Sequence, residues 1–390
     1  MFSRKCQFRP GVSCFVLGPR GTGKTYWLHQ LYPGALFVDL LEARTFNLLA
    51  ADPQRLENLI RAAPHGLPVI IDEIQKLPAL LDEVHRLIET QHVWFILTGS
   101  SARKLRRGGV NLLGGRAVTK QFHPLTATEL GDAFDLGKAL KYGLLPSLYD
   151  ESRPFLPEEY LQSYVQTYLK EEVIQEGLTR NLGAFSRFWE AASLSQGQLL
   201  NITGVARECQ IKRKLAENYF GILEDLLIGI TIPPFQKRAR RRVTQHRKFF
   251  LFDAGVYRAV RPRGPLDSAE EIDGAGLETL VFQHLQALLS DRHAADALSY
   301  WRTATGLEVD FVVYTEDAFV AMEVKRKRTL GASDLHGLKA FGSDYPEARK
   351  VVLYGGDREE MVADIRLVPL AKALPTLESI IWPPCLPSDR

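Results

Sequence analysis

The chain has 390 residues, of which 45% are hydrophobic and 24% charged, as in an ordinary globular protein with room for two or three domains. A formal net charge of +3 is too small to indicate nucleic-acid binding by itself. No apolar stretch approaches the roughly 18 residues of a membrane span, the first residues do not resemble a signal peptide, and the four cysteines form no CxxC pair. We therefore expect a cytoplasmic protein without a membrane partner, a zinc site or a disulfide framework.

The first predicted site lies between a short apolar run, residues 12–17, and a helical pattern that begins at residue 24. The eight residues at this junction read GPRGTGKT, the G-x-x-x-x-G-K-[ST] phosphate loop in the strand–loop–helix setting that it requires. In such a loop, backbone N–H groups and the helix N-terminus surround the phosphates of ATP, the lysine reaches the β- and γ-phosphates, and the last residue binds Mg²⁺. The predicted nucleotide-binding residues are Gly18, Pro19, Arg20, Gly21, Thr22, Gly23, Lys24 and Thr25.

Two further buried strands are predicted, each ending in polar residues. The first ends in Asp72, which we expect to bind Mg²⁺, and Glu73, which we expect to act as the base that orients the attacking water. A helix cap with an acid in the first helical turn is the alternative. The second strand, residues 93–99, leads to Ser100, which could sense the γ-phosphate or cap a helix. Strands that alternate with helical segments in this way predict a doubly wound parallel α/β sheet.

The middle of the chain is predicted to be a helical connector, residues 155–194, followed by a helix-turn-helix over residues 203–226. Two strands, residues 230–235 and 248–253, follow and are joined by a basic stretch that we interpret as the wing of a winged helix. Basic residues on such elements contact DNA phosphates, although a solvated basic loop is the usual alternative. The predicted DNA contacts are Lys212, Arg213, Lys214, Lys237, Arg238, Arg240, Arg241, Arg242, Arg247 and Lys248.

The last third has the predicted order α-β-β-β-α-β, beginning with a long helix over residues 267–289. Carboxylates are expected to converge from this helix, which carries Glu278, and from two strands that carry Asp310 and Glu323. Such a cluster could hold Mg²⁺, with Mn²⁺ as an alternative ion, and Lys325 would then position the nucleophile or screen developing charge. The alternative is a structural ion cluster in which Lys325 neutralises the acids.

The phosphate loop, the hydrophobic strand ending in Asp72-Glu73 and the TGSS strand end together resemble the AAA+ superfamily of ATPases. Arg116 follows in the stretch GGRA, where AAA+ proteins commonly carry an arginine finger. This resemblance implies a homo-oligomer, for example a hexamer, in which Arg116 completes the neighbouring subunit's site. A plain surface arginine is the alternative.

The D…ExK pattern in the last third resembles the PD-(D/E)xK nuclease superfamily, with Val309 where that pattern often has proline. Taken whole, the chain resembles a bacterial and archaeal family that joins an AAA-type ATPase to a C-terminal domain of uncharacterised function. The expected domains are an ATPase domain over 1–150, a connector and winged helix over 151–260, and a restriction-endonuclease-like α/β domain over 261–390. The predicted function is ATP-dependent processing of double-stranded or branched DNA with Mg²⁺-dependent cleavage; the alternative is a non-cleaving, ATP-gated switch that binds DNA or protein.

Overall fold

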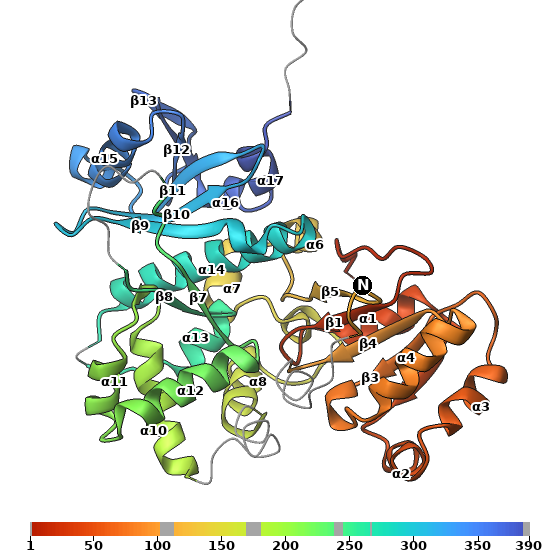
Figure 1. Ribbon diagram of the computed structural model, residues 1–390. Helices are drawn as coiled ribbons and strands as arrows, with labels where there is room; N and C mark the ends of the chain where they lie inside the picture. Colours follow the sequence, from red (N-terminus) through yellow and green to blue (C-terminus); the bar gives the residue numbers. More distant parts are fainter. Residues whose placement is uncertain (1, 102–112, 169–180, 238–244, 266, 385–390) are drawn as a thin grey trace, which may run out of the picture. The chain divides into compact units, whose positions relative to one another are not determined.

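The computed structural model describes residues 2–101, 113–168, 181–237, 245–265 and 267–384 (Figure 1). The chain divides into two compact units. One comprises residues 4–124 together with 225–228, and the other comprises the rest of the chain.

The first unit is built on a five-stranded parallel sheet with the strand order β2-β3-β4-β1-β5. Its strands are β1 (Cys14–Leu17), β2 (Leu36–Asp39), β3 (Val69–Asp72), β4 (Phe95–Gly99) and β5 (Val118–Gln121). Because all five strands run in one direction, their C-terminal ends meet at one edge of the sheet. The predicted parallel α/β sheet is confirmed.

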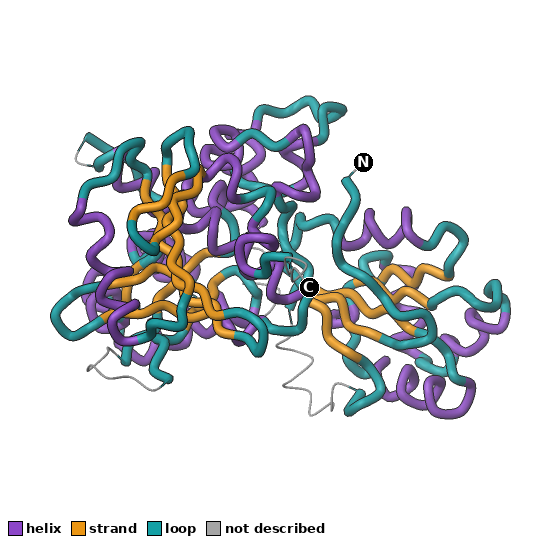
Figure 2. Tube along the Cα trace, turned by 90° about the horizontal axis from the view of Figure 1, so that it is seen from above, coloured by secondary structure: helices purple, strands orange, loops and turns teal. Residues whose placement is uncertain are grey.

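Helices lie on both faces of this sheet, as Figure 2 shows. They are α1 (Lys24–Leu31), α2 (Ala43–Ala51), α3 (Arg55–Arg61) and α4 (Leu80–Gln91). Leu28 of α1 packs against Val16 and Ile70 on one face, whereas α2, α3 and α4 cover the apolar residues that point to the other. Buried strands that are covered on both faces have no polar side to expose, which explains their continuous apolar sequences.

The second unit begins with a helical region that carries a small antiparallel sheet, β6-β8-β7. Its helices are α6 (Ala127–Leu130), α7 (Leu136–Tyr142), α8 (Pro157–Ser163), α10 (Leu182–Leu194), α11 (Ile202–Glu208), α12 (Arg213–Asp225) and α13 (Ala254–Val260). Its strands are β6 (Gln198–Leu199), β7 (Gly229–Ile232) and β8 (Lys248–Leu251). The predicted helix pair and strand pair coincide with α11, α12, β7 and β8, and the winged-helix assignment stays a prediction. Much of the predicted wing, residues 238–244, lies outside the described residues.

The C-terminal part of this unit contains a six-stranded mixed sheet with the order β13-β14-β12-β11-β10-β9. Its strands are β9 (Leu298–Arg302), β10 (Glu308–Tyr314), β11 (Phe319–Lys325), β12 (Arg349–Tyr354), β13 (Glu360–Val362) and β14 (Ile365–Pro369). The helices are α14 (Ala269–Asp291), α15 (His336–Asp344), α16 (Leu370–Ala373) and α17 (Leu377–Ile381). The order α14-β9-β10-β11-α15-β12 is the order predicted from the sequence, whereas β13 and β14 were not predicted.

Phe235, just after β7, is an aromatic side chain that joins the small sheet to the large one. It is buried in the core between the six-stranded sheet and α15, with its ring 6.0 Å from that of Phe341 and 5.2 Å from that of Tyr345. Tyr300 of β9 holds this segment through two backbone hydrogen bonds, one from the Phe235 N–H to the Tyr300 carbonyl (2.6 Å) and one from the Tyr300 N–H to the carbonyl of Pro233 (3.1 Å). Phe235 therefore ties the segment after β7 to the core of the large sheet. Of the helices in the described ranges, none combines the length and the apolar character needed to cross a membrane.

Candidate functional site

The phosphate loop leaves the end of β1 and turns directly into α1. A Cβ atom at Gly18 would lie 2.1 Å from the carbonyl oxygen of Phe122, so only glycine fits there. Gly23, at the N-terminal end of α1, has a φ of 89°, a left-handed conformation that also favours glycine. The buried Lys24 ammonium donates to the carbonyls of Gly18 (2.6 Å) and Pro19 (3.0 Å), which places its charge on the loop.

Asp72 lies where β3 ends and meets the hydroxyl of the residue that ends the phosphate loop. The Thr25 hydroxyl donates to Asp72 Oδ2 at 2.8 Å, and the Thr98 hydroxyl donates to Asp72 Oδ1. A hydroxyl oxygen and a carboxylate oxygen side by side are the donor types that Mg²⁺ takes beside a nucleotide phosphate. Thr25 and Asp72 therefore fit the predicted role of holding Mg²⁺, which would neutralise phosphate charge when bound.

Glu73 is held by neighbours on two sides. Its φ of 57° is a left-handed conformation that is uncommon outside glycine, and its N–H donates to the Thr98 hydroxyl (3.1 Å). The Gln75 amide donates to Glu73 Oε2 and to the Ser100 hydroxyl (2.9 Å), and that hydroxyl is 3.4 Å from the same carboxylate oxygen. The structure thus brings Ser100 beside Glu73. Gln75 was not among the predicted site residues.

Arg116, the predicted arginine finger, forms an ion pair with Glu89 of α4 and donates to the carbonyl of Gly114 (3.1 Å). Its side chain is 39% exposed. The hydrogen bond from Arg116 lowers the pKa of the Glu89 carboxyl below its ordinary value. A role for Arg116 in a neighbouring subunit stays a prediction.

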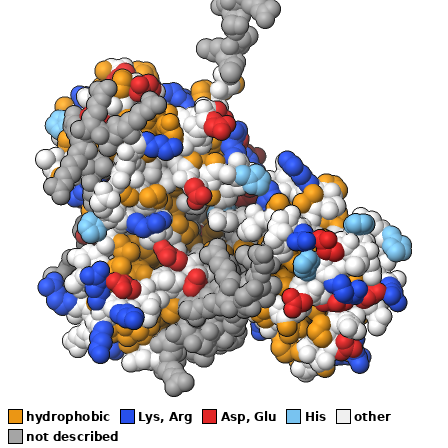
Figure 3. All heavy atoms as spheres, in the orientation of Figure 1, with side chains coloured by type: hydrophobic (Ala, Val, Ile, Leu, Met, Phe, Trp, Pro, Cys, Tyr) orange, Lys and Arg blue, Asp and Glu red, His pale blue; other side chains and the backbone are white. Residues whose placement is uncertain are grey.

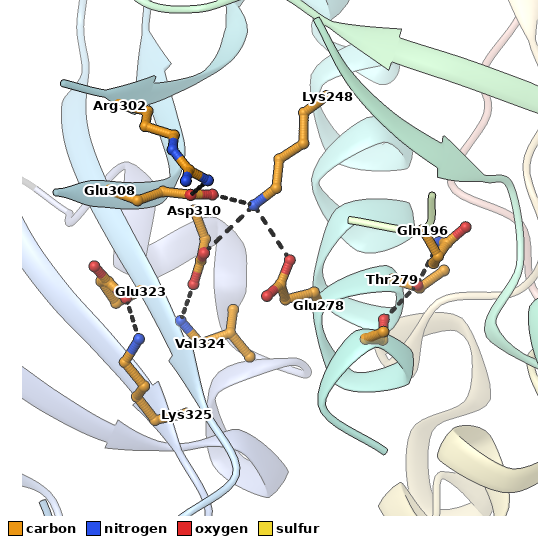
Figure 4. Close-up of polar contacts among 11 residues, drawn as sticks. Gln196, Lys248, Glu278, Thr279, Arg302, Glu308, Asp310, Glu323, Val324 and Lys325 are labelled. Carbon is orange, nitrogen blue, oxygen red and sulfur yellow. Dashed lines mark hydrogen bonds and ion pairs between the residues drawn. The ribbon is translucent and has the colours of Figure 1, made fainter. Parts of the chain in front are cut away.

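A second group of charged residues lies in the other unit, between α14, β8 and the large sheet (Figure 4). The predicted residues Glu278 and Asp310 point toward one another, and Glu323 and Lys325 form a separate ion pair of 2.5 Å beside them. A bulge in the pairing of β9 with β10, between Val309 and Val312, contains Asp310. Bulges re-aim side chains, which accounts for the turn of this carboxylate toward α14.

Lys248 lies at the centre of this group and not on an exposed wing, which corrects its predicted role as a DNA contact. Its ammonium is 2.7 Å from Glu308, 3.3 Å from Glu278 and 3.5 Å from Asp310, and its side chain is only 2% exposed. Burial alone lowers the pKa of Lys248, but the carboxylates of Glu278, Asp310 and Glu308 outweigh burial, so the net pKa lies above the ordinary value. The physical reason for the correction is that β8 turns this residue inward, toward acids that compensate its buried charge.

The carboxylates of this group do not fit a divalent metal ion in the arrangement described. Among the residues that the structure describes, no three His, Cys, Asp or Glu side chains are grouped so that they could hold a metal. Burial raises the pKa of Glu278 to about 7 and that of Glu323 to about 8; the Asp310 carboxylate adds to both shifts, and Lys248 and Lys325 oppose them. Glu308, whose other oxygen accepts from Arg302 at 2.7 Å, was not among the predicted site residues.

The remaining predicted DNA contacts fall into two groups. Lys212, Arg213, Lys214, Lys237 and Arg247 are exposed. Arg238, Arg240, Arg241 and Arg242 lie outside the described residues. In Figure 3, lysine and arginine side chains gather over the region of α11 and α12, with acidic side chains among them. Part of this charge is paired within the chain, because Arg213 forms an ion pair of 2.9 Å with Glu217.

Comparison with known proteins gives three matches to family models. Residues 134–267 match a domain of unknown function (DUF8612), and residues 273–373 match another (DUF4143). The crystal structure of protein VC1899 from Vibrio cholerae is 11% identical, with 94% of this chain and 96% of that chain covered, but its TM-score of 0.24 is too low to indicate a shared fold. No curated protein matches the chain. Residues 12–131 match the model described as an AAA domain, which supports an AAA-type ATPase at the N-terminal end of this chain.

Proposed function

We propose that the chain hydrolyses ATP at the edge of the five-stranded sheet where the C-terminal ends of its strands meet. We propose further that the bound nucleotide controls the affinity of the chain for DNA. The observation that carries the ATPase proposal is the contact of Thr25 with Asp72, 2.8 Å apart, beside a carboxylate held by Gln75 and Ser100. These residues come from the phosphate loop and from two strands that end at the same edge. Enzymes catalyse phosphoryl transfer mainly by placing charged groups around the phosphates and the attacking water. Lys24, Asp72 and Glu73 are charged groups placed in this way.

Each residue of the site has a distinct role in this proposal. Lys24 exchanges its contacts with the loop carbonyls for contacts with the β- and γ-phosphates. Thr25 and Asp72 would hold Mg²⁺, which would neutralise phosphate charge. Glu73 accepts a proton from the attacking water or orients that water, and Gln75 fixes the direction of the Glu73 carboxylate. Because Ser100 contacts both Gln75 and Glu73, a shift at the end of β4 would move the base.

The ATPase part of the proposal is tested with Glu73→Gln, which keeps the shape of the side chain and removes its basicity. We expect kcat for ATP hydrolysis to fall by roughly 10²–10⁴ while ATP binding is retained. The assay is phosphate release at saturating ATP, with nucleotide affinity measured by isothermal titration. Equal turnover in Glu73→Gln and the natural protein would remove Glu73 from the mechanism.

The DNA part of the proposal is supported by the exposed Lys212 and Lys214 at the start of α12 and by Lys237 and Arg247 near the ends of the hairpin. Contacts of this kind are made to phosphates, so we expect affinity that is largely independent of sequence and falls steeply with salt. Fluorescence anisotropy with labelled duplex and branched DNA, in ATP and in ADP, measures both affinity and gating. Lys212→Glu with Lys214→Glu is expected to weaken binding at least tenfold. The exposed Lys372→Glu in α16 is the control and is expected to bind like the natural protein.

Cleavage of DNA by Glu278, Asp310, Glu323 and Lys325 stays a prediction, and the form of the proposal that the site geometry favours is the non-cleaving one. The reason is that Lys248 already contacts two of these carboxylates and Lys325 contacts a third. Incubation with linear, nicked and branched DNA in Mg²⁺ or Mn²⁺ with ATP tests this directly. We expect intact DNA. Products that disappear in Glu323→Ala would establish the nuclease instead.

A further inference from the structure

The charged group between β8, α14 and β10 has no part in the proposed ATP hydrolysis, and its carboxylates surround a common space. Glu278 comes from α14, and Glu308 and Asp310 come from β10. Buried carboxylates that face one another either take up a proton or are compensated by a cation between them. In this chain the cation is the ammonium of Lys248 (Figure 4).

We propose that the carboxylate cluster of the C-terminal domain is a cation site whose ligand is the chain's own Lys248, so that no divalent metal ion binds there. An ammonium has three N–H donors, and three carboxylates lie within 3.5 Å of this one. The ammonium therefore has one N–H donor for each of the three carboxylates without any added ion.

The carboxylates have further partners that a metal ion would also have to displace. Asp310 Oδ2 accepts the N–H of Val324 at 2.9 Å, and Glu308 is shared with Arg302 at 2.7 Å. Glu323, the third predicted ligand, is bound to Lys325 at 2.5 Å. A divalent ion placed among these groups would lie within a few ångströms of an ammonium, and like charges at that distance repel strongly in a buried site.

Glu323 is also enclosed by the helix that follows the strands. Gly337 in the first turn of α15 lies so close that a Cβ there would be 2.5 Å from Glu323 Oε1. The same Cβ would lie 1.9 Å from the backbone carbonyl oxygen of Glu308, so only glycine allows this approach. The helix therefore lies directly against Glu323 Oε1 and leaves little space there for an ion with its water ligands.

Lys248 has little freedom to leave the cluster, because the strand that carries it is anchored to α14. The ring of Phe250 stacks on that of Phe282 with centroids 4.4 Å apart. Gln196 bridges the two elements: its amide donates to Thr279 at 2.6 Å, and its carbonyl oxygen accepts the N–H of Leu251 at 2.9 Å. These contacts hold the strand in place, and the Lys248 side chain on it is only 2% exposed, which keeps its ammonium among the carboxylates.

This inference goes beyond the proposed ATPase and is tested by removing the ammonium. Lys248→Met keeps much of the aliphatic length and leaves Glu278, Glu308 and Asp310 without their cation. Lys350→Met is the matched control, since Lys350 is also a buried lysine of this unit but pairs with the single, exposed carboxylate of Asp364. Mn²⁺ binding is followed by the loss of the free-ion paramagnetic resonance signal, without nucleotide, and thermal unfolding is recorded with and without Mn²⁺.

We expect Lys248→Met to bind Mn²⁺ at least about tenfold more tightly than the natural protein does, and its lowered Tm to rise when Mn²⁺ is added. The added affinity should disappear when Glu278→Gln is combined with Lys248→Met. The natural protein and Lys350→Met should respond alike and weakly. A Lys248→Met protein that folds but gains no Mn²⁺ site would overturn the proposal.

A second measurement keeps the proposal testable if Lys248→Met does not fold. Mn²⁺ binding by the natural protein is compared with that of Glu278→Gln, and we expect no difference between the two. An additional Mn²⁺ ion in the natural protein that Glu278→Gln lacks would show that a metal displaces the lysine. Neither result touches the ATPase, which is assessed separately with Glu73→Gln.

Discussion

His284 is a buried histidine whose hydrogen bonds require the neutral form of its ring. Its Nδ1 lies 2.6 Å from the carbonyl oxygen of Leu280, which can only accept, so Nδ1 carries the proton. Its Nε2 accepts the N–H of Ala127 at 2.9 Å and therefore carries none. A second proton on the ring would point at a donor and would bury a charge. Burial accordingly lowers the pKa of His284 to about 4, although the Leu280 carbonyl and Glu129 oppose this change.

The lowered pKa predicts that acidification destabilises the second unit. Because the folded pKa lies below the unfolded value of 6.5, the contribution of His284 to stability is complete above pH 6.5 and is lost as the pH falls toward 4. Between pH 7 and pH 5 the loss is about 2 kcal/mol, since the unfolded chain takes up most of a proton that the folded chain does not.

Urea unfolding followed by tryptophan fluorescence at pH 7 and pH 5 measures this loss. The control is His284→Gln, which has no titrating group in this range and should lose about 2 kcal/mol less than the natural protein over the same interval. His123 is also buried and its pKa is lowered to about 4, so the comparison between the two proteins matters more than either slope alone. Parallel losses in the two proteins would refute the assignment of a neutral ring to His284.

Three further predictions concern the ATPase unit. Gly18→Ala should lower ATP affinity more than tenfold in isothermal titration, because its Cβ would collide with the Phe122 carbonyl; Gly221→Ala, where a Cβ meets nothing within 4 Å, is the control and should bind normally. Gln75→Leu should lower kcat about tenfold without raising KM for ATP, since it frees the Glu73 carboxylate, and a change confined to KM would argue against that role. Arg116→Ala should lower turnover by about 10³, and mixing it with Glu73→Gln should restore phosphate release if the arginine acts on a neighbouring subunit; a mixture no more active than its components would place Arg116 outside the site.

The nucleotide site could be predicted from the sequence because its determinants are local. The phosphate loop is eight consecutive residues between a strand and a helix, and Asp72 ends the buried strand β3 with Glu73 directly after it. Parallel strands bring such ends together without further information. Gln75 was missed because its contact with Glu73 depends on the left-handed turn at that residue, which no pattern in the sequence indicates.

The second cluster could be predicted only in part, because its centre comes from a distant strand. Glu278, Asp310 and Glu323 follow from helix and strand periodicity, but Lys248 directly follows Arg247 and was grouped with the basic hairpin. A run of basic residues does not indicate at which residue the following strand, β8, begins. Once β8 begins at Lys248, packing against α14 decides that this side chain points inward and Arg247 stays exposed.

Because Phe235 is buried between the six-stranded sheet and α15, it affects whether the C-terminal domain can be expressed alone. A fragment that starts at residue 261 would lack both Phe235 and Lys248. It would expose the apolar side chains that Phe235 covers, and it would leave Glu278 and Glu308 without their cation. Such a fragment should be poorly soluble and should aggregate through its exposed apolar surface. The two stretches of unknown function are better expressed as one polypeptide.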